Sequence, residues 1–136
     1  MGELSARYSG ASFYCYSPLV SADSDAVNGE LYGAGVVLVP RLDKAEKILS
    51  LDCDFLGYEP VGEDSVAEFA RGRKVDDDPA AMNRLYVAEG SFTLTGGSAD
   101  HRYRTAPSQI LPIAILLAGE LAAKTGDAGL AAIAEA

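Results

Sequence analysis

This sequence has little of what metal and nucleic-acid sites require. It contains one His and only two Cys, Cys15 and Cys53, without C-x-x-C spacing. A zinc or iron–sulfur site made by this chain alone is therefore not expected. Both Cys are predicted to be packed free thiols, with a disulfide as the open alternative. With 11 basic residues against 20 acidic ones, the net charge is −9, so a phosphate backbone or an anionic membrane surface would repel the chain, and no nucleic-acid partner is predicted.

Long apolar runs are also missing. The longest, Ile110–Ala123, is interrupted by Pro112, Gly119 and Glu120, and it falls short of the roughly 20 apolar residues that a membrane-spanning helix needs. We expect a buried helix in a soluble chain that does not insert into a membrane. The start, Met1–Ser5, has neither the basic nor the apolar segment of an export signal, so the sequence leaves the localisation of this chain open.

Length and composition fit one folded domain. The chain has 136 residues, 49% of them hydrophobic, which is enough for a single core without disulfide or metal support. Residues 1–11 are small or polar and show no periodicity, so we expect a flexible arm there. Residues 12–136 are expected to form one α/β domain, as a fragment of a longer protein.

Two strand patterns end in acidic residues. The stretch Lys47–Gly57 begins with a short apolar run and turns acidic at Asp52 and Asp54, and Arg84–Gly90 repeats the pattern. The first run reads as a strand that is covered on both faces. A helix predicted between the two strands would make a parallel βαβ unit. The fold class we predict is α/β, with three layers: a mostly parallel sheet and helices on both of its faces.

The remaining elements follow from local signals. The strongest helix signal is Ser65–Gly72, where Ser65 and Glu68 match a capping box and Val66, Phe69 and Ala70 form an apolar stripe. A closing helix is predicted after Thr105–Ser108, with Pro112 in its first turn and its buried face made by Ile110, Ile113, Leu116, Leu117 and Leu121. Weaker signals predict a strand at Phe13–Tyr16, a helix of about ten residues capped within Ser21–Ser24, and a short strand within Ala99–Arg104. Val36–Pro40 is either a short strand or an apolar connection.

Each candidate site residue has a plainer structural interpretation. Asp54 could orient a ribose or pterin group, but capping the following turn is the more common role of Asp at a strand end. The loop Thr93–Ser98 could cradle a phosphate, although it lacks the lysine and the spacing of a P-loop. His101 could be a base, but no activated Ser or Cys accompanies it, and we expect Asp100 or a backbone carbonyl to hold it. Arg102 and Arg104 could pair with the acidic strand ends, and a solvated ion pair is the plainer alternative.

Four blocks of the sequence resemble a known family. This chain is similar, over roughly residues 10–122, to the molybdopterin-oxidoreductase-like part of the large iron–sulfur subunit of alternative complex III, a bacterial quinol:electron-acceptor oxidoreductase; such proteins are also labelled iron–sulfur-cluster-containing hydrogenase components. The blocks that carry the resemblance are Leu42–Ala45, Ser50–Gly57, Met82–Glu89 and Leu94–Arg102.

The resemblance implies a domain like those of the dimethyl-sulfoxide-reductase superfamily, in which the segments after the strands hold a pyranopterin dinucleotide. Carried over to this sequence, the vestigial cofactor-binding residues would be Asp54, Glu89, Thr95, Gly96 and Gly97. The sequence offers no catalytic residues and no metal ligands of its own. The resemblance therefore implies a domain without molybdopterin, with the iron–sulfur clusters elsewhere in the parent protein.

The expected role is that of a scaffold and subunit contact in an electron-transfer complex. Its partners would be other parts of the parent subunit and neighbouring electron-transfer subunits, on the periplasmic side of a membrane. The alternative is a small-molecule, nucleotide or pterin binder that uses Asp54, Glu89, Gly96 and Gly97 at the strand ends. An independent hydrolase is the weakest hypothesis, because the sequence offers no activated nucleophile.

Overall fold

The chain forms two units that we describe separately. The computed structural model describes residues 2–8, 10, 12, 14, 23–59, 61–75 and 79–135, and contacts divide the chain into Met1–Leu38 and Val39–Ala136. The first unit contains α1 (Gly2–Arg7) and α2 (Asp23–Tyr32). Helix α2 confirms the predicted helix, whereas the predicted strand Phe13–Tyr16 lies outside the described residues except for Tyr14. Flexibility of residues 1–11 stays a prediction, although α1 gives part of this segment regular structure.

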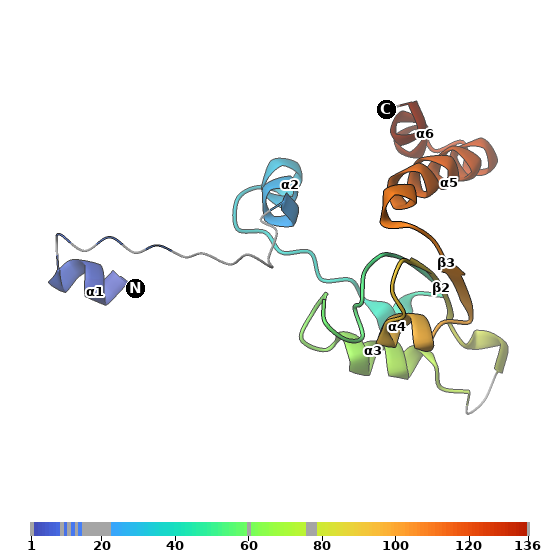
Figure 1. The fold of residues 1–136 in the computed structure, drawn as a ribbon, viewed down its shortest axis with the longest axis horizontal. Helices are drawn as coiled ribbons and strands as arrows, with labels where there is room; N and C mark the ends of the chain where they lie inside the picture. The colour runs from blue at the N-terminus through green and yellow to red at the C-terminus, as the bar shows by residue number, and fades with distance from the viewer. Residues whose placement is uncertain are drawn as a thin grey trace. The chain divides into compact units, whose positions relative to one another are not determined.

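The second unit contains a small parallel sheet. Its strands are β1 (Lys47–Leu51), β2 (Arg84–Glu89) and β3 (His101–Arg104), in the order β1-β2-β3, and both pairs are parallel. Helix α3 (Ser65–Gly72) lies in the connection between β1 and β2, as the βαβ prediction requires. The α/β class is thus confirmed, and Val36–Pro40 is an exposed connection without regular structure. In Figure 1, α3 lies on one side of the strands and the C-terminal helices lie on the other.

The core lies between the sheet and α3. Leu85 and Val87 of β2 are completely buried, and the same cluster includes Ile48, Phe55 and Phe69. The rings of Phe55 and Phe69 meet edge to face, with their centroids 5.7 Å apart. The alternation of side chains along a strand explains why Ile48 and Ser50 are buried while the exposed fraction of Leu49 is 46%. The expectation that this strand is covered on both faces is therefore wrong, because the face that carries Leu49 is open. Strand β1 is also an edge strand of the sheet.

Helix α3 has the predicted bounds, but the predicted cap and stripe are wrong. Asp64 is its N-cap and makes no capping hydrogen bond with its side chain, while the Ser65 hydroxyl donates to the Phe55 carbonyl. The carboxylate of Glu68 accepts a hydrogen bond from the Leu42 amide at the start of the 3₁₀ helix η1 (Leu42–Lys44). The buried side chains of α3 are those of Ser65, Glu68 and Phe69, whereas Val66 and Ala70 are exposed. A long-range polar contact thus decides which side of the helix faces inward.

The C-terminal part forms a helical hairpin with much apolar exposure. After the 3₁₀ helix η3 (Pro107–Gln109), α5 (Ile110–Thr125) ends at Gly126, whose φ of 73° permits the turn into α6 (Ala128–Glu135). Pro112 lies in the first turn of α5, as predicted. The predicted buried face is wrong: 70% of Leu116 and 41% of Leu121 are exposed, and the buried residue is Ala118. Among the described residues, no helix has both the length and the apolar character needed to cross a membrane.

Candidate functional site at the carboxyl ends of the strands

The carboxylate of Asp54 joins the segment after β1 to α4 (Leu94–Gly97), a single helical turn within the predicted loop. Its Oδ1 accepts hydrogen bonds from the amide of Thr95 at 3.0 Å and from the hydroxyl of Thr95 at 2.8 Å, and its Oδ2 accepts one from the Tyr58 amide at 3.1 Å. The Thr95 hydroxyl in turn accepts from the Leu56 amide at 3.0 Å. Asp54 therefore caps the turn that follows it and also fixes a second segment 41 residues away.

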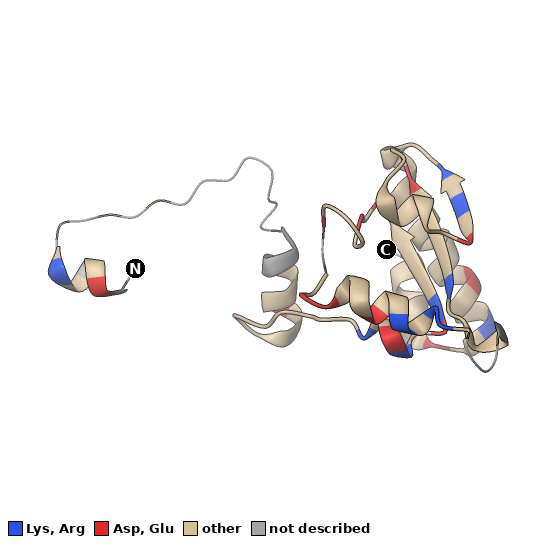
Figure 2. Ribbon diagram, turned by 90° about the horizontal axis from the view of Figure 1, so that it is seen from below, with Lys and Arg blue, Asp and Glu red and all other residues tan. Residues whose placement is uncertain are grey.

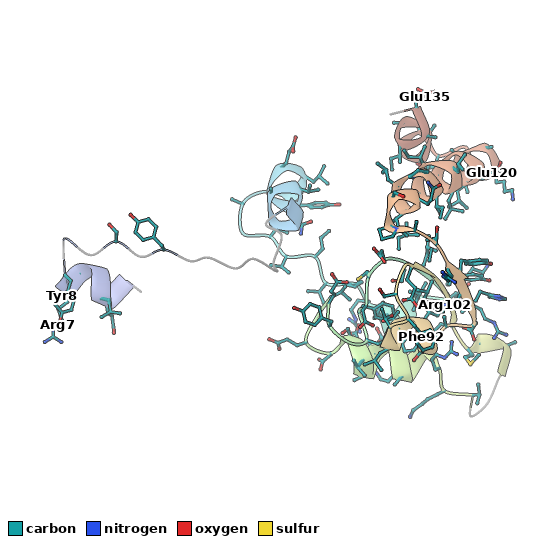
Figure 3. All side chains as sticks on the ribbon, viewed as in Figure 1. Arg7, Tyr8, Phe92, Arg102, Glu120 and Glu135 are labelled. Atoms are coloured by element: carbon teal, nitrogen blue, oxygen red, sulfur yellow. The ribbon has the colours of Figure 1, made fainter. Side chains whose placement is uncertain are left out.

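Glu89, the last residue of β2, makes the second half of the site. Its Oε2 accepts a hydrogen bond from the Thr93 hydroxyl at 2.6 Å, and its Oε1 accepts one from Arg102 Nε at 2.5 Å. The Thr93 oxygen accepts from the Gly96 amide at 3.0 Å, which makes Thr93 the N-cap of α4. The Arg102 guanidinium lies 4.8 Å from the centroid of the Phe92 ring, and Figure 3 labels both residues. The predicted pairing of Arg102 with an acidic strand end is confirmed.

Electrostatics favour the charged form of both carboxylates. Burial raises the pKa of Asp54, but the hydrogen bonds from Thr95 and Tyr58 outweigh it and leave this pKa below the usual value. Burial also raises the pKa of Glu89, yet Thr93 and Arg102 lower it further than burial raises it. The exposed fraction of Glu89 is only 2%, and that of Thr95 is 0%. The two carboxylates are thus ionised. Both of them and Thr95 are hydrogen-bonded within the chain and largely shielded from solvent.

Four of the five predicted site residues come together here. Asp54, Glu89, Thr95 and Gly96 share the network, and a Cβ at Gly96 would collide with the carboxylate of Glu89. Gly97 is exposed instead, with the edge of the Phe92 ring 3.5 Å from the position that its Cβ would take. Asp52 has a φ of 51° and accepts a hydrogen bond from the Gly90 amide, so it also fastens two strand ends together.

The predicted hold of Asp100 on His101 is wrong. Its ring stacks on Tyr86 of the neighbouring strand, with centroids 4.8 Å apart. Asp100 is engaged elsewhere: both of its oxygens accept hydrogen bonds from the Arg73 guanidinium, at 2.7 and 3.0 Å, and Oδ2 also accepts from the Leu85 amide. The hydrogen bonds from Arg73 lower the pKa of Asp100 to about 2, against the opposing effect of burial.

A hollow lies beside this network. Its volume is about 510 Å³, and it is lined by Gly90, Arg104, Thr105, Ala106 and Pro107 at the ends of β2 and β3. In a parallel sheet this is the end at which ligands bind. The guanidinium of Arg104 is exposed and forms no ion pair with any residue that the structure describes. The predicted pairing of Arg104 with an acidic strand end is thus absent there.

The chemistry available at the site is limited. Within the described residues no group of three His, Cys, Asp or Glu side chains could hold a metal ion. Burial raises the pKa of the Cys53 thiol, as do the charges of Glu59 and Asp54, so the reactive thiolate is disfavoured. Cys53 is free, as predicted, while Cys15 lies outside the described residues.

No protein-family model and no curated protein matches this chain.

Two features of this unit are not indicated by the sequence. The ion pair of Arg73 with Asp100 joins residues that are 27 positions apart in the sequence, and no local pattern indicates it. Asn83 is 1% exposed, and neither side-chain atom has a hydrogen-bond partner among the described residues; nothing in the structure explains this. Thr93 belongs to the residue types preferred at a helix N-cap, so the sequence carried a signal for this cap.

Proposed function

We propose that this chain is a non-catalytic α/β module, related to the molybdopterin-oxidoreductase-like part of an iron–sulfur electron-transfer subunit, and that it acts as scaffold and subunit contact. The observation that supports this most concerns the carboxyl ends of the strands, which we call the rim of the sheet: the carboxylates there are bound by other groups of the same chain. The oxygens of Asp54 and Glu89 accept their hydrogen bonds from Thr93, Thr95, Tyr58 and Arg102 of the same chain.

A pyranopterin does not fit these residues as they stand. To bind one through Asp54 or Glu89, the chain would have to break hydrogen bonds that tie α4 and its N-cap Thr93 to the segment after β1 and to the end of β2. Thr95, which belongs to α4 itself, is completely buried. We therefore assign these residues to the architecture of the rim. A three-layer arrangement of this chain with helices on both faces of the sheet, periplasmic placement of the parent protein and clusters elsewhere in it remain parts of this proposal.

Elemental analysis tests the proposal directly. The purified chain is assayed for molybdenum and tungsten, and its acid extract is examined for fluorescent pterin. We expect neither metal in stoichiometric amount within this segment and no pterin released from it. Stoichiometric metal or released pterin in the isolated chain would refute the proposal.

The second candidate is a small-molecule binder, favoured by the hollow beside Gly90, Arg104 and Thr105. The guanidinium of Arg104, which forms no ion pair with a residue that the structure describes, suits a small phosphate or carboxylate. A thermal-shift panel with inorganic phosphate, nucleotides and pterins tests it in the wild type and in Arg104→Gln. Arg104 is the better residue to change, because Asp54→Ala would disturb the fold. A shift that the variant loses supports this candidate; the first proposal predicts no shift.

A further inference from the structure

The outer edge of β1 has no strand beside it among the described residues. On the inner side, the Glu46 carbonyl accepts from the Arg84 amide at 2.9 Å, and the Asp52 amide donates to the Ala88 carbonyl at 2.8 Å. Because backbone groups alternate in direction along a strand, the N–H and C=O groups of Lys47, Leu49 and Leu51 point away from β2. These groups form a row of donors and acceptors at the edge of the sheet.

An apolar groove runs along the same edge. Its volume is about 310 Å³, and its walls include Pro40, Leu42, Ile48, Leu51 and Val61. Leu49 adds an apolar side chain that is 46% exposed. An exposed apolar strand edge of this kind is a template for pairing with another strand.

The opposite edge of the sheet differs. Strand β3 consists of His101, Arg102, Tyr103 and Arg104, and Figure 2 shows the blue of its basic residues along this strand. Charged side chains on an edge strand discourage pairing with other chains. The two edges are therefore not equivalent, and β1 is the one suited to strand addition.

We propose that the outer edge of β1 binds an extended segment of a partner polypeptide as a fourth strand. The segment carries apolar side chains at alternate positions, which enter the groove. It also carries an acidic residue beside the exposed Lys47 at the start of β1. The net charge of −9 further favours a basic partner.

A second copy of this chain fits less well. Antiparallel pairing of two β1 strands about Leu49 would place Glu46 of one copy opposite Asp52 of the other, and like charges in that position are destabilising. Two chains with a charge of −9 also repel each other. A second copy is thus an outcome that the experiment has to distinguish from the partner strand.

A labelled peptide tests the proposal on the full chain. The probe is fluorescein-labelled Glu-Val-Thr-Val-Thr-Val-Lys-Arg, and binding is followed by fluorescence anisotropy. The control is the same peptide with N-methylated valines, which cannot complete a ladder of hydrogen bonds. We expect the probe to bind, and the N-methylated peptide to bind at least about tenfold more weakly, since it loses backbone hydrogen bonds.

Two matched variants locate the binding. Leu49→Lys puts a charge on the proposed edge, whereas Tyr103→Lys makes the same kind of change on β3. We expect Leu49→Lys to weaken binding about tenfold and Tyr103→Lys to leave it unchanged.

The proposal would be overturned by no binding, by equal binding of the N-methylated peptide, or by unchanged binding in Leu49→Lys. A dimer in light scattering that Leu49→Lys dissociates would also overturn it, in favour of a second copy. The pterin and metal assays do not bear on this result, so it can fail independently of the proposed function.

Discussion

The missing side chain of Gly96 allows the carboxylate of Glu89 to lie directly against α4. In Gly96→Ala the new Cβ would displace this buried carboxylate, and we expect the free energy of unfolding to fall by about 1–3 kcal/mol, the usual cost of overpacking. Gly97→Ala is the matched control, because its Cβ would meet only the Phe92 ring at an ordinary 3.5 Å. Urea denaturation measures both variants, and equal losses would contradict the assigned role of Gly96.

Asp100 gives the unit a predictable response to acid. Its pKa falls from 3.8 to about 2 in the folded chain, because Arg73 and the Leu85 amide bind the charged form. A lowered folded-state pKa means that the stabilisation is complete above pH 3.8 and is lost as the pH falls from 3.8 toward 2. In total it amounts to at most about 2 kcal/mol. Asp100→Asn should lower stability at neutral pH and flatten the acid dependence in that window, as followed by thermal melts; an unchanged slope would exclude the ion pair as its source.

Helix α4 is too short to be stable by itself, so its cap decides whether it forms. The Thr93 hydroxyl accepts from the Gly96 amide and donates to Glu89. Thr93→Ala should therefore cost about 1–2 kcal/mol, as the loss of an N-cap typically does. It should also speed hydrogen exchange at the Gly96 amide. Thr93→Ser keeps the hydroxyl and should retain most of the protection, whereas equal exchange in the two variants would contradict the capping role.

The sequence predicts elements well where the signal is local. Apolar runs that end in acidic residues mark β1 and β2, and the bounds of α3 follow from its end signals. The errors arise where distant residues decide. Glu68 is buried where it binds the Leu42 amide, and Asp100 binds Arg73 and not His101, whose ring stacks on Tyr86. At the site, the capping role of Asp54 was predictable, but its bonds to Thr95 depend on how two strand ends meet.

The second unit as a whole leaves many apolar groups uncovered. The exposed fractions of Leu111 and Leu116 on α5 are 68% and 70%, and β1 adds an apolar strand edge. Large exposed apolar patches on a protein surface mark contacts with other proteins. The acidic net charge of −9 keeps separate molecules apart and opposes aggregation through these patches. Such a surface is consistent with the proposed role in subunit contact.

The exposed part of α5 can be tested separately from the strand edge. Leu111→Gln combined with Leu116→Gln removes apolar surface that the chain does not bury, so we expect the free energy of unfolding to change by no more than about 0.5 kcal/mol, as for ordinary surface substitutions. Fluorescence of an apolar dye such as ANS should fall, because dye-accessible surface is lost.

Ala118→Gln is the control, since Ala118 is only 7% exposed and a polar side chain there should destabilise the hairpin. A double variant that loses as much stability as Ala118→Gln would show that Leu111 and Leu116 are covered within the chain itself, which would remove this helix from the proposed contact surface.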